Sequence, residues 1–93
     1  MKQLHVDTDD MLVARYSEGD NKAFDELLAR YQGKLFNYIY FIVRSQEVAE
    51  DIFQEAFVKV IKTLRSGRYN EEGKFLPWVI RIAHNLVIDH FRK

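Results

Sequence analysis

Basic and aromatic side chains alternate in the last third of this chain. The members of this group are Arg65, Arg68, Tyr69, Lys74, Phe75, Trp78 and Arg81. Such a mixture suits single-stranded DNA, because cations follow the phosphates while aromatic faces stack on unpaired bases, at about 1–3 kcal/mol per base. A plainer interpretation is that Phe75 and Trp78 close a hydrophobic core. We expect a core position for Trp78, which stays among the DNA-binding candidates, and an exposed position for Tyr69.

Acidic and basic side chains separate along residues 46–65. The acids Glu47, Glu50, Asp51 and Glu55 come first, and the bases Lys59, Lys62 and Arg65 follow. One explanation is the helix dipole, which favours acids near the N-terminus and bases near the C-terminus. The other is that the acidic end docks on a basic protein surface while the basic end, with Lys62, points toward nucleic acid. Both explanations can hold at once.

The charge of the whole chain is divided in the same direction. The formal net charge is zero, yet residues 1–58 carry six basic and eleven acidic side chains, a net of −5. Residues 59–93 carry eight basic and three acidic side chains, a net of +5. Such asymmetry indicates two different partners. In the basic part, Asn85 has an amide that can reach a base edge or a phosphate, or it is a solvated surface residue.

Little in the sequence supports a catalytic site or a metal site. The chain has no cysteine and no glycine-rich phosphate loop, and its serines lack the context of a nucleophile elbow. His84 and His90 are six residues apart and fall on different faces of a helix, which is not a ligand spacing. Asp7, Asp9 and Asp10 begin like a calcium loop but lack its glycine and closing glutamate. We therefore predict a binding module that is not an enzyme and uses no metal or cofactor.

Four helices are expected to position these residues. Apolar spacings of three and four and the capping residues predict helices from about Thr8 to Tyr16, Asp20 to Val43, Ser45 to Leu64, and near Pro77 to Phe91. Either Asp7 or Thr8 caps the first. Gly33 costs about 1 kcal/mol relative to Ala inside the second, so a break there is an alternative. The apolar stripe of the last helix is predicted as Trp78, Val79, Ile82, Leu86, Ile88 and Phe91.

Length and composition bound the architecture. Ninety-three residues, 47% of them apolar, suffice for one core, and we predict an all-α compact bundle of about four helices with residues 1–93 as one domain. Residues 66–74 form a polar loop. The longest apolar stretch, residues 35–43, is too short to span a membrane, and the N-terminus is not a signal peptide. We expect a soluble cytoplasmic protein.

Three blocks carry a family resemblance. They are Gly-Asp-Asn-Lys-Ala-Phe-Asp-Glu-Leu at 19–27 with Arg-Tyr at 30–31, Ala-Glu-Asp-Ile-Phe-Gln-Glu-Ala-Phe at 49–57, and Phe-Leu-Pro-Trp-Val-Ile-Arg-Ile-Ala-His-Asn at 75–85 with Asp89 and Arg92. In this order and spacing they resemble region 2 of extracytoplasmic-function (ECF) sigma factors of bacterial RNA polymerase. The resemblance implies a helical domain that docks on the clamp helices of the polymerase β′ subunit. The docking residues that it implies are Arg30, Asp51, Gln54, Glu55 and Val58.

The resemblance also implies a role in opening promoter DNA. Residues 66–74 would capture a base flipped out of the minus-ten element, and the last helix, with Asn85, would support recognition of the single-stranded non-template strand. Stacking partners must offset the few kcal/mol that extracting a base costs. The DNA-binding residues expected in this way are Lys62, Arg65, Arg68, Tyr69, Lys74, Phe75, Trp78, Arg81 and Asn85. An anti-sigma factor is a further implied partner.

Two features depart from the family. Glu71 and Glu72 reduce the positive charge of the loop, which weakens phosphate attraction there. The chain also ends at Lys93, where such factors continue into a helix-turn-helix domain, so we expect an excised N-terminal fragment. Two other hypotheses stay open: a small helical protein-interaction module without a DNA role, and a regulator that places its last helix in the major groove of duplex DNA.

Overall fold

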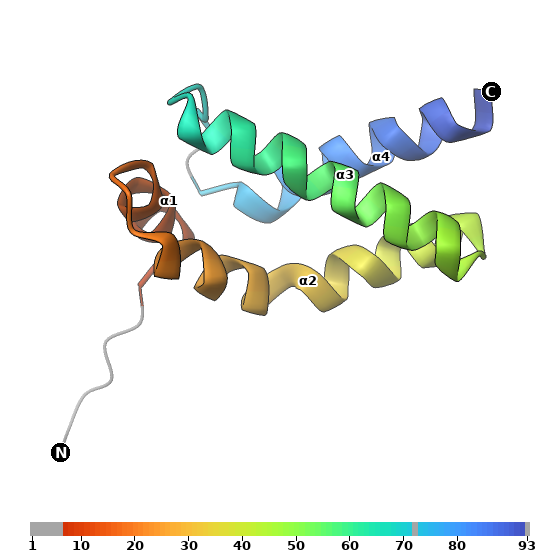
Figure 1. The fold of residues 1–93 in the computed structure, drawn as a ribbon, viewed down its shortest axis with the longest axis horizontal. Helices are drawn as coiled ribbons and strands as arrows, with labels where there is room; N and C mark the ends of the chain where they lie inside the picture. Colours follow the sequence, from red (N-terminus) through yellow and green to blue (C-terminus); the bar gives the residue numbers. More distant parts are fainter. Residues whose placement is uncertain (1–6, 72, 93) are drawn as a thin grey trace, which may run out of the picture.

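The computed structural model describes residues 7–71 and 73–92, which form a bundle of α-helices (Figure 1). The helices are α1 (Asp9–Ser17), α2 (Asn21–Val43), α3 (Gln46–Arg65) and α4 (Phe75–Arg92). No strand occurs among the described residues. The predicted all-α class with four helices is therefore confirmed. The expectation for Glu72 concerns a residue outside the described part of the chain.

Side-chain caps explain where three of the helices begin. Thr8, Asp20 and Ser45 have extended backbone, and each side chain accepts a hydrogen bond from an N–H in the first turn that follows. Such caps satisfy donors that have no partner inside the helix. Thr8, rather than Asp7, caps α1. Gly19, with φ of 108°, supplies the left-handed residue after α1, as its position predicts.

The turn between α2 and α3 depends on an arginine in a left-handed conformation. Helix α2 runs through Gly33 without a break, so the alternative of an interruption there is wrong. The helix ends at Arg44, which has φ of 58° and donates its N–H to the carbonyl of Tyr40. Ser45 follows directly as the cap of α3, and α3 runs back antiparallel to α2 (Figure 1). Glycine or asparagine usually occupies such a position, so nothing in the sequence pointed to Arg44.

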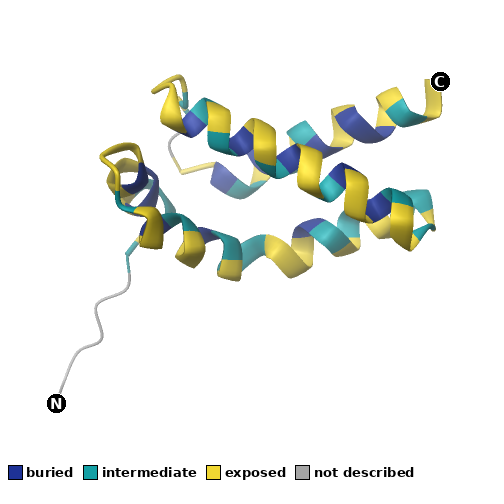
Figure 2. Cartoon of the chain, viewed as in Figure 1, coloured by how far each residue is buried: buried dark blue, intermediate teal, exposed yellow. Residues whose placement is uncertain are grey.

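The hydrophobic core lies between α2, α3 and α4, with α1 packed on α2 and α3. Its residues appear in dark blue on the inner faces of the helices (Figure 2). The buried side chains are Leu12, Val13, Tyr16, Ala23, Leu27, Leu35, Ile39, Ala49, Ile52, Ala56, Val60, Leu64, Phe75, Trp78, Val79, Ala83, Leu86 and Val87. Most of them belong to the apolar stripes that the spacing predicts.

The end of α4 differs from the predicted stripe. Ile88 is 37% exposed and Phe91 is 60% exposed, so neither belongs to the core. The buried face of α4 passes through Ala83 and Leu86, and its next position is His90, which is half-buried. Ile88 and Phe91 therefore point away from the neighbouring helices. Within the described residues, no helix combines the length and hydropathy that crossing a bilayer requires.

Candidate functional site

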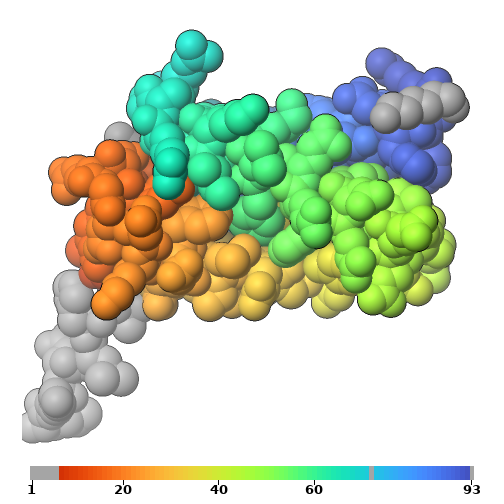
Figure 3. All heavy atoms as spheres, viewed as in Figure 1, coloured from red at the N-terminus to blue at the C-terminus, as the bar shows by residue number. Residues whose placement is uncertain are grey.

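The described part of the loop, residues 66–71 and 73–74, lies beside α1 at one end of the bundle, as the space-filling view also shows (Figures 1 and 3). At the beginning of the loop, the Ser17 hydroxyl donates a hydrogen bond to the carbonyl of Leu64, at 3.2 Å. Nε of Arg65 donates to the hydroxyl of Tyr16 at 3.0 Å, and its guanidinium lies 5.6 Å from the Tyr16 ring centroid. The last turn of α3 is thus attached to α1.

The end of the loop is attached to the same helix. Gly73 has φ of 71° and donates its N–H to Oδ2 of Asp10 at 2.9 Å. Between the two attachments, residues of α1 and of the loop line an open cleft of about 450 Å³. The residues that line it are Asp10, Val13, Ala14, Ser17, Leu64, Gly67 and Tyr69. A cleft of this volume is of the size that small ligands occupy.

The three aromatic candidates of this region pack on one another. The Tyr69 ring lies 4.8 Å from the Trp78 ring and 6.1 Å from the Phe75 ring, between centroids, and the last two are 5.9 Å apart. Trp78 is buried, as expected, and Phe75 is buried too. In this structure neither ring is open to stacking on a base, and both serve as core residues.

Tyr69 is half-buried, so the expectation of an exposed ring is wrong. Its hydroxyl donates to the carbonyl of Glu71 at 2.8 Å. Burial raises the pKa of Tyr69 to about 12, and the charges of Asp10 and Glu71 act in the same direction. Of the three aromatic residues, Tyr69 is the one that lines the cleft.

The polar DNA-binding candidates are exposed along the loop and the two helices that flank it. They are Lys62, Arg65, Arg68, Lys74, Arg81 and Asn85. Arg81 forms an ion pair with Glu71 at 3.2 Å. Glu71 therefore reduces the positive charge of the loop and at the same time holds a cation of α4. Within the described residues, Lys62, Arg68 and Lys74 have no ion-pair partner. Their charges are available to a phosphate.

The docking candidates on α3 form one exposed face. Asp51, Gln54, Glu55 and Val58 are all exposed, and they lie on the side of α3 that α2 and α4 leave uncovered. Grooves flank this face on both sides. One, of about 380 Å³ between α3 and α4, is lined by Val48, Asp51, Ile52, Glu55, Leu86, Asp89 and His90. The other, of about 560 Å³ between α2 and α3, is lined by Gln32, Gly33, Phe36, Glu50, Phe53 and Gln54.

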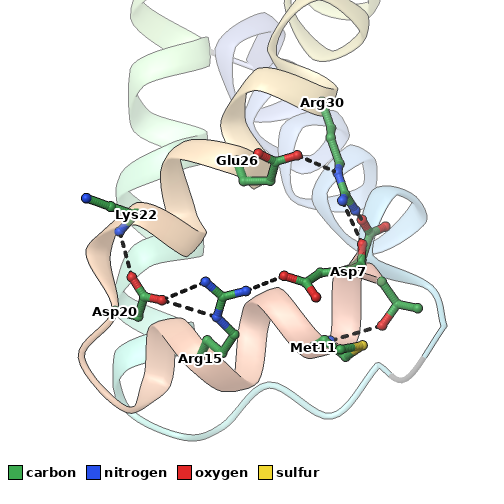
Figure 4. Close-up of polar contacts among 9 residues, drawn as sticks. Asp7, Met11, Arg15, Asp20, Lys22, Glu26 and Arg30 are labelled. Atoms are coloured by element: carbon green, nitrogen blue, oxygen red, sulfur yellow. Dashed lines mark hydrogen bonds and ion pairs between the residues drawn. The ribbon is translucent and has the colours of Figure 1, made fainter. Parts of the chain in front are cut away.

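The structure places Arg30 with α1. Its guanidinium forms an ion pair with Asp9 at 2.9 Å, donates to the carbonyl of Asp7 at 2.6 Å, and lies 3.5 Å from Glu26 (Figure 4). Tyr31 donates its hydroxyl to the same Asp9 carboxylate. Burial, then this hydrogen bond, raises the pKa of Tyr31 to about 12. No contact in the described part of the chain brings Arg30 to the α3 face.

Several residues of these surfaces were not predicted from the sequence as site residues. Asp89 adds a third carboxylate to the α3–α4 groove, and His90 lies beside it. Asp10 and Ser17 hold the loop. The spacing of seven residues puts Asp10 and Ser17 on one face of α1, and this is the signal that could have paired them. No group of three or more potential ligand side chains for a metal occurs among the described residues.

Comparison with known proteins agrees with this architecture. A family model of sigma-70 region 2 matches residues 27–93. The chain is 37% identical over 87 residues to the RNA polymerase sigma-H factor of Pseudomonas aeruginosa, an alignment covering 94% of the chain and 44% of that protein. It is 42% identical over 78 residues to the ECF RNA polymerase sigma-E factor of Escherichia coli K12, covering 84% of the chain and 39% of that protein.

A solved structure extends the comparison to three dimensions. The NMR structure of an engineered region 2 of sigmaE in complex with GTAAAA superposes with a TM-score of 0.80 at 36% identity, covering 96% of this chain and 90% of that one. The chain spans less than half the length of the curated relatives that it matches. Because the family model covers more than half of the chain and the fold agrees with a solved region 2, the chain belongs to the sigma-70 region 2 family.

Proposed function

We propose that this chain is the region 2 domain through which a sigma factor docks on RNA polymerase and binds the minus-ten promoter element in transcription initiation. The observation that carries the proposal is the separation of two surfaces on one bundle. The first half of α3 exposes acids, and the loop of residues 66–74 with its flanking helices exposes cations. A domain that holds a protein and a nucleic acid at the same time needs two such surfaces.

The polymerase contact is proposed on the α3 face. Asp51 and Glu55 present carboxylates next to the α3–α4 groove, and Gln54 borders the α2–α3 groove, which has Phe36 and Phe53 in its lining. Val58 is 49% exposed and adds an apolar contact. An acidic ridge between two grooves suits a basic coiled coil such as the β′ clamp helices. Since Arg30 is already bonded to α1, we leave it out of this surface.

The DNA contact is proposed on the loop and α4. Arg68 and Lys74 would hold the phosphates of the non-template single strand, and Asn85 would approach a base edge. A base extruded from the minus-ten element would enter the cleft between α1 and the loop, against Tyr69, which lines it. The NMR structure of an engineered region 2 of sigmaE in complex with GTAAAA supports a minus-ten sequence as the ligand. An anti-sigma factor is a further proposed partner.

A titration with the isolated β′ clamp-helix peptide tests the docking. Asp51→Arg should weaken binding about tenfold, because it reverses a charge in the centre of the contact. Asp25→Arg is the matched control, since Asp25 is exposed on α2 and the same charge change falls outside the α3 face. Equal affinities of the two variants, or no binding by the wild type, would contradict docking through α3.

Fluorescent oligonucleotides test the DNA contact. The chain should prefer single-stranded GTAAAA to a scrambled strand and to duplex. Arg68→Ala and Lys74→Ala should each reduce the slope of log K against log salt by about 0.7, the value for one phosphate contact on a single strand. Lys34→Ala, an exposed cation of α2, should leave the slope unchanged. A preference for duplex would favour the major-groove regulator, and peptide binding without DNA binding would favour the protein-interaction module.

A further inference from the structure

Both ends of the DNA-binding loop are attached to a single face of α1. Asp10, Val13, Ala14 and Ser17 form this face, at intervals of three and four residues, and all of them line the cleft. Ser17 holds Leu64 before the loop, and Asp10 holds Gly73 at its end. The two attachment points lie seven residues apart, about 10 Å along the helix. This distance sets the separation of the two ends of the loop.

Helix α1 is itself held firmly, as a support for the loop must be. Leu12 and Tyr16 on its inner side are buried in the core. At its start, Asp9 is paired with Arg30 of α2. At its end, two guanidinium nitrogens of Arg15 donate to Oδ2 of Asp20, at 3.1 and 2.9 Å (Figure 4). The position of α1 therefore follows that of α2.

Asp10 is the residue of α1 whose bonding pattern singles it out. Oδ2 accepts from the N–H of Gly73, the left-handed residue two positions before α4 begins. Oδ1 is buried and has no hydrogen-bond partner within residues 7–71 and 73–92. An unpaired buried carboxylate oxygen is unfavourable, so this arrangement favours a role beyond stabilising the bundle. The charge of Asp10 also contributes, after burial, to the raised pKa of Tyr69.

We propose that Asp10 is a positioning residue for DNA binding: by holding Gly73 it keeps the described part of the loop, residues 66–71 and 73–74, in the conformation that binds a single strand. The inference rests on the proposed function, because the loop that α1 would hold in place is the one proposed to bind DNA. Asp10 does not touch the DNA in this scheme, and as a negative charge near a phosphate-binding surface it would by itself weaken the attraction. Asp10 would therefore raise the affinity for DNA by holding the loop and lower it through its negative charge.

Two substitutions at the same position separate these effects. Asp10→Ala removes both the charge and the acceptor of the Gly73 hydrogen bond, whereas Asp10→Asn removes the charge and keeps a carbonyl acceptor. Both variants also lose one of the two acids of the first turn of α1, so their stabilities can be compared directly by urea unfolding. The readouts are amide hydrogen exchange at Gly73 without DNA and binding of fluorescent GTAAAA and of a scrambled strand.

Loss of the acceptor should expose the Gly73 amide to exchange in Asp10→Ala but not in Asp10→Asn. Asp10→Ala should also bind GTAAAA about tenfold more weakly than Asp10→Asn, while the two bind the scrambled strand equally. Ser17→Ala, which loosens the other end of the loop, should weaken GTAAAA binding in the same direction.

Three results would count against the proposal or its basis. Equal GTAAAA affinity of Asp10→Ala and Asp10→Asn would overturn the positioning role. An unprotected Gly73 amide in the wild type would show that Asp10 does not hold the loop. A protected Gly73 amide in a wild type that binds no oligonucleotide would instead overturn the proposed function, while the attachment of the loop to α1 would stand.

Discussion

The ring of Tyr69 meets the indole of Trp78 edge to face, with centroids 4.8 Å apart and planes inclined by 66°. This arrangement suits the opposite charge of ring face and ring edge. It joins the loop that contains Tyr69 to the core, since Trp78 is buried. The loop is therefore anchored in the bundle through Tyr69 as well as through α1.

Replacing Tyr69 should destabilise the whole domain. We expect Tyr69→Ala to lower the free energy of unfolding by about 2 kcal/mol, because it removes a half-buried ring and its edge-to-face contact. Tyr69→Phe should cost about 1 kcal/mol, the hydrogen bond to the Glu71 carbonyl. Urea unfolding measures both. An unchanged midpoint for Tyr69→Ala would mean that the ring is not part of the core.

Stability should fall in alkali in a way that depends on two tyrosines. The pKa values of Tyr31 and Tyr69 are raised to about 12 in the folded chain, from about 10 in the unfolded chain. Their contribution is complete below pH 10 and is lost as the pH rises from 10 to about 12, because only the unfolded state then releases these protons. Tyr31→Phe and Tyr69→Phe should each flatten this decline in urea unfolding. Parallel pH profiles for the variants and the wild type would contradict the raised pKa values.

Arg30→Ala should affect stability rather than docking. Its ion pair with Asp9 joins α1 to α2, with both side chains 23% exposed, and its loss should cost about 1 kcal/mol after allowance for solvent screening. The exposed Lys34 provides the control, since Lys34→Ala should change stability by less than about 0.5 kcal/mol. Affinity for the clamp-helix peptide should stay the same in both variants. A selective loss of that affinity in Arg30→Ala would return Arg30 to the docking surface.

A truncation in the core should be far more costly than one at the end of α4. Leu35 is fully buried on α2, and Leu35→Ala should lower the free energy of unfolding by about 2–5 kcal/mol. Phe91 is 60% exposed, and Phe91→Ala should cost less than about 1 kcal/mol. Thermal unfolding would show the contrast clearly, at about 4–8 °C per kcal/mol for a domain of this size. Similar losses for both would show that the last turn of α4 is covered.

The helices and the family can both be predicted from the amino-acid sequence alone. The signals for the helices act through bonds and contacts within a few residues. They are caps such as Thr8 and Ser45, the left-handed Gly19 and apolar spacings of three and four. Such local signals can be read directly from the chain. The position of Trp78 in the core can be predicted in the same way. The sequence also separates the acidic start of α3 from the cations that follow, since the charges are visible without any knowledge of packing.

Which of these residues contact one another follows from the packing of the helices. Arg30 bonds to α1, the ring of Tyr69 packs on Trp78, and Asp10 holds Gly73 across 63 residues. Each contact depends on how the helices cross and where a loop returns. A periodic pattern of one helix does not contain that information, because a polar side chain finds its partner only after the cores have packed.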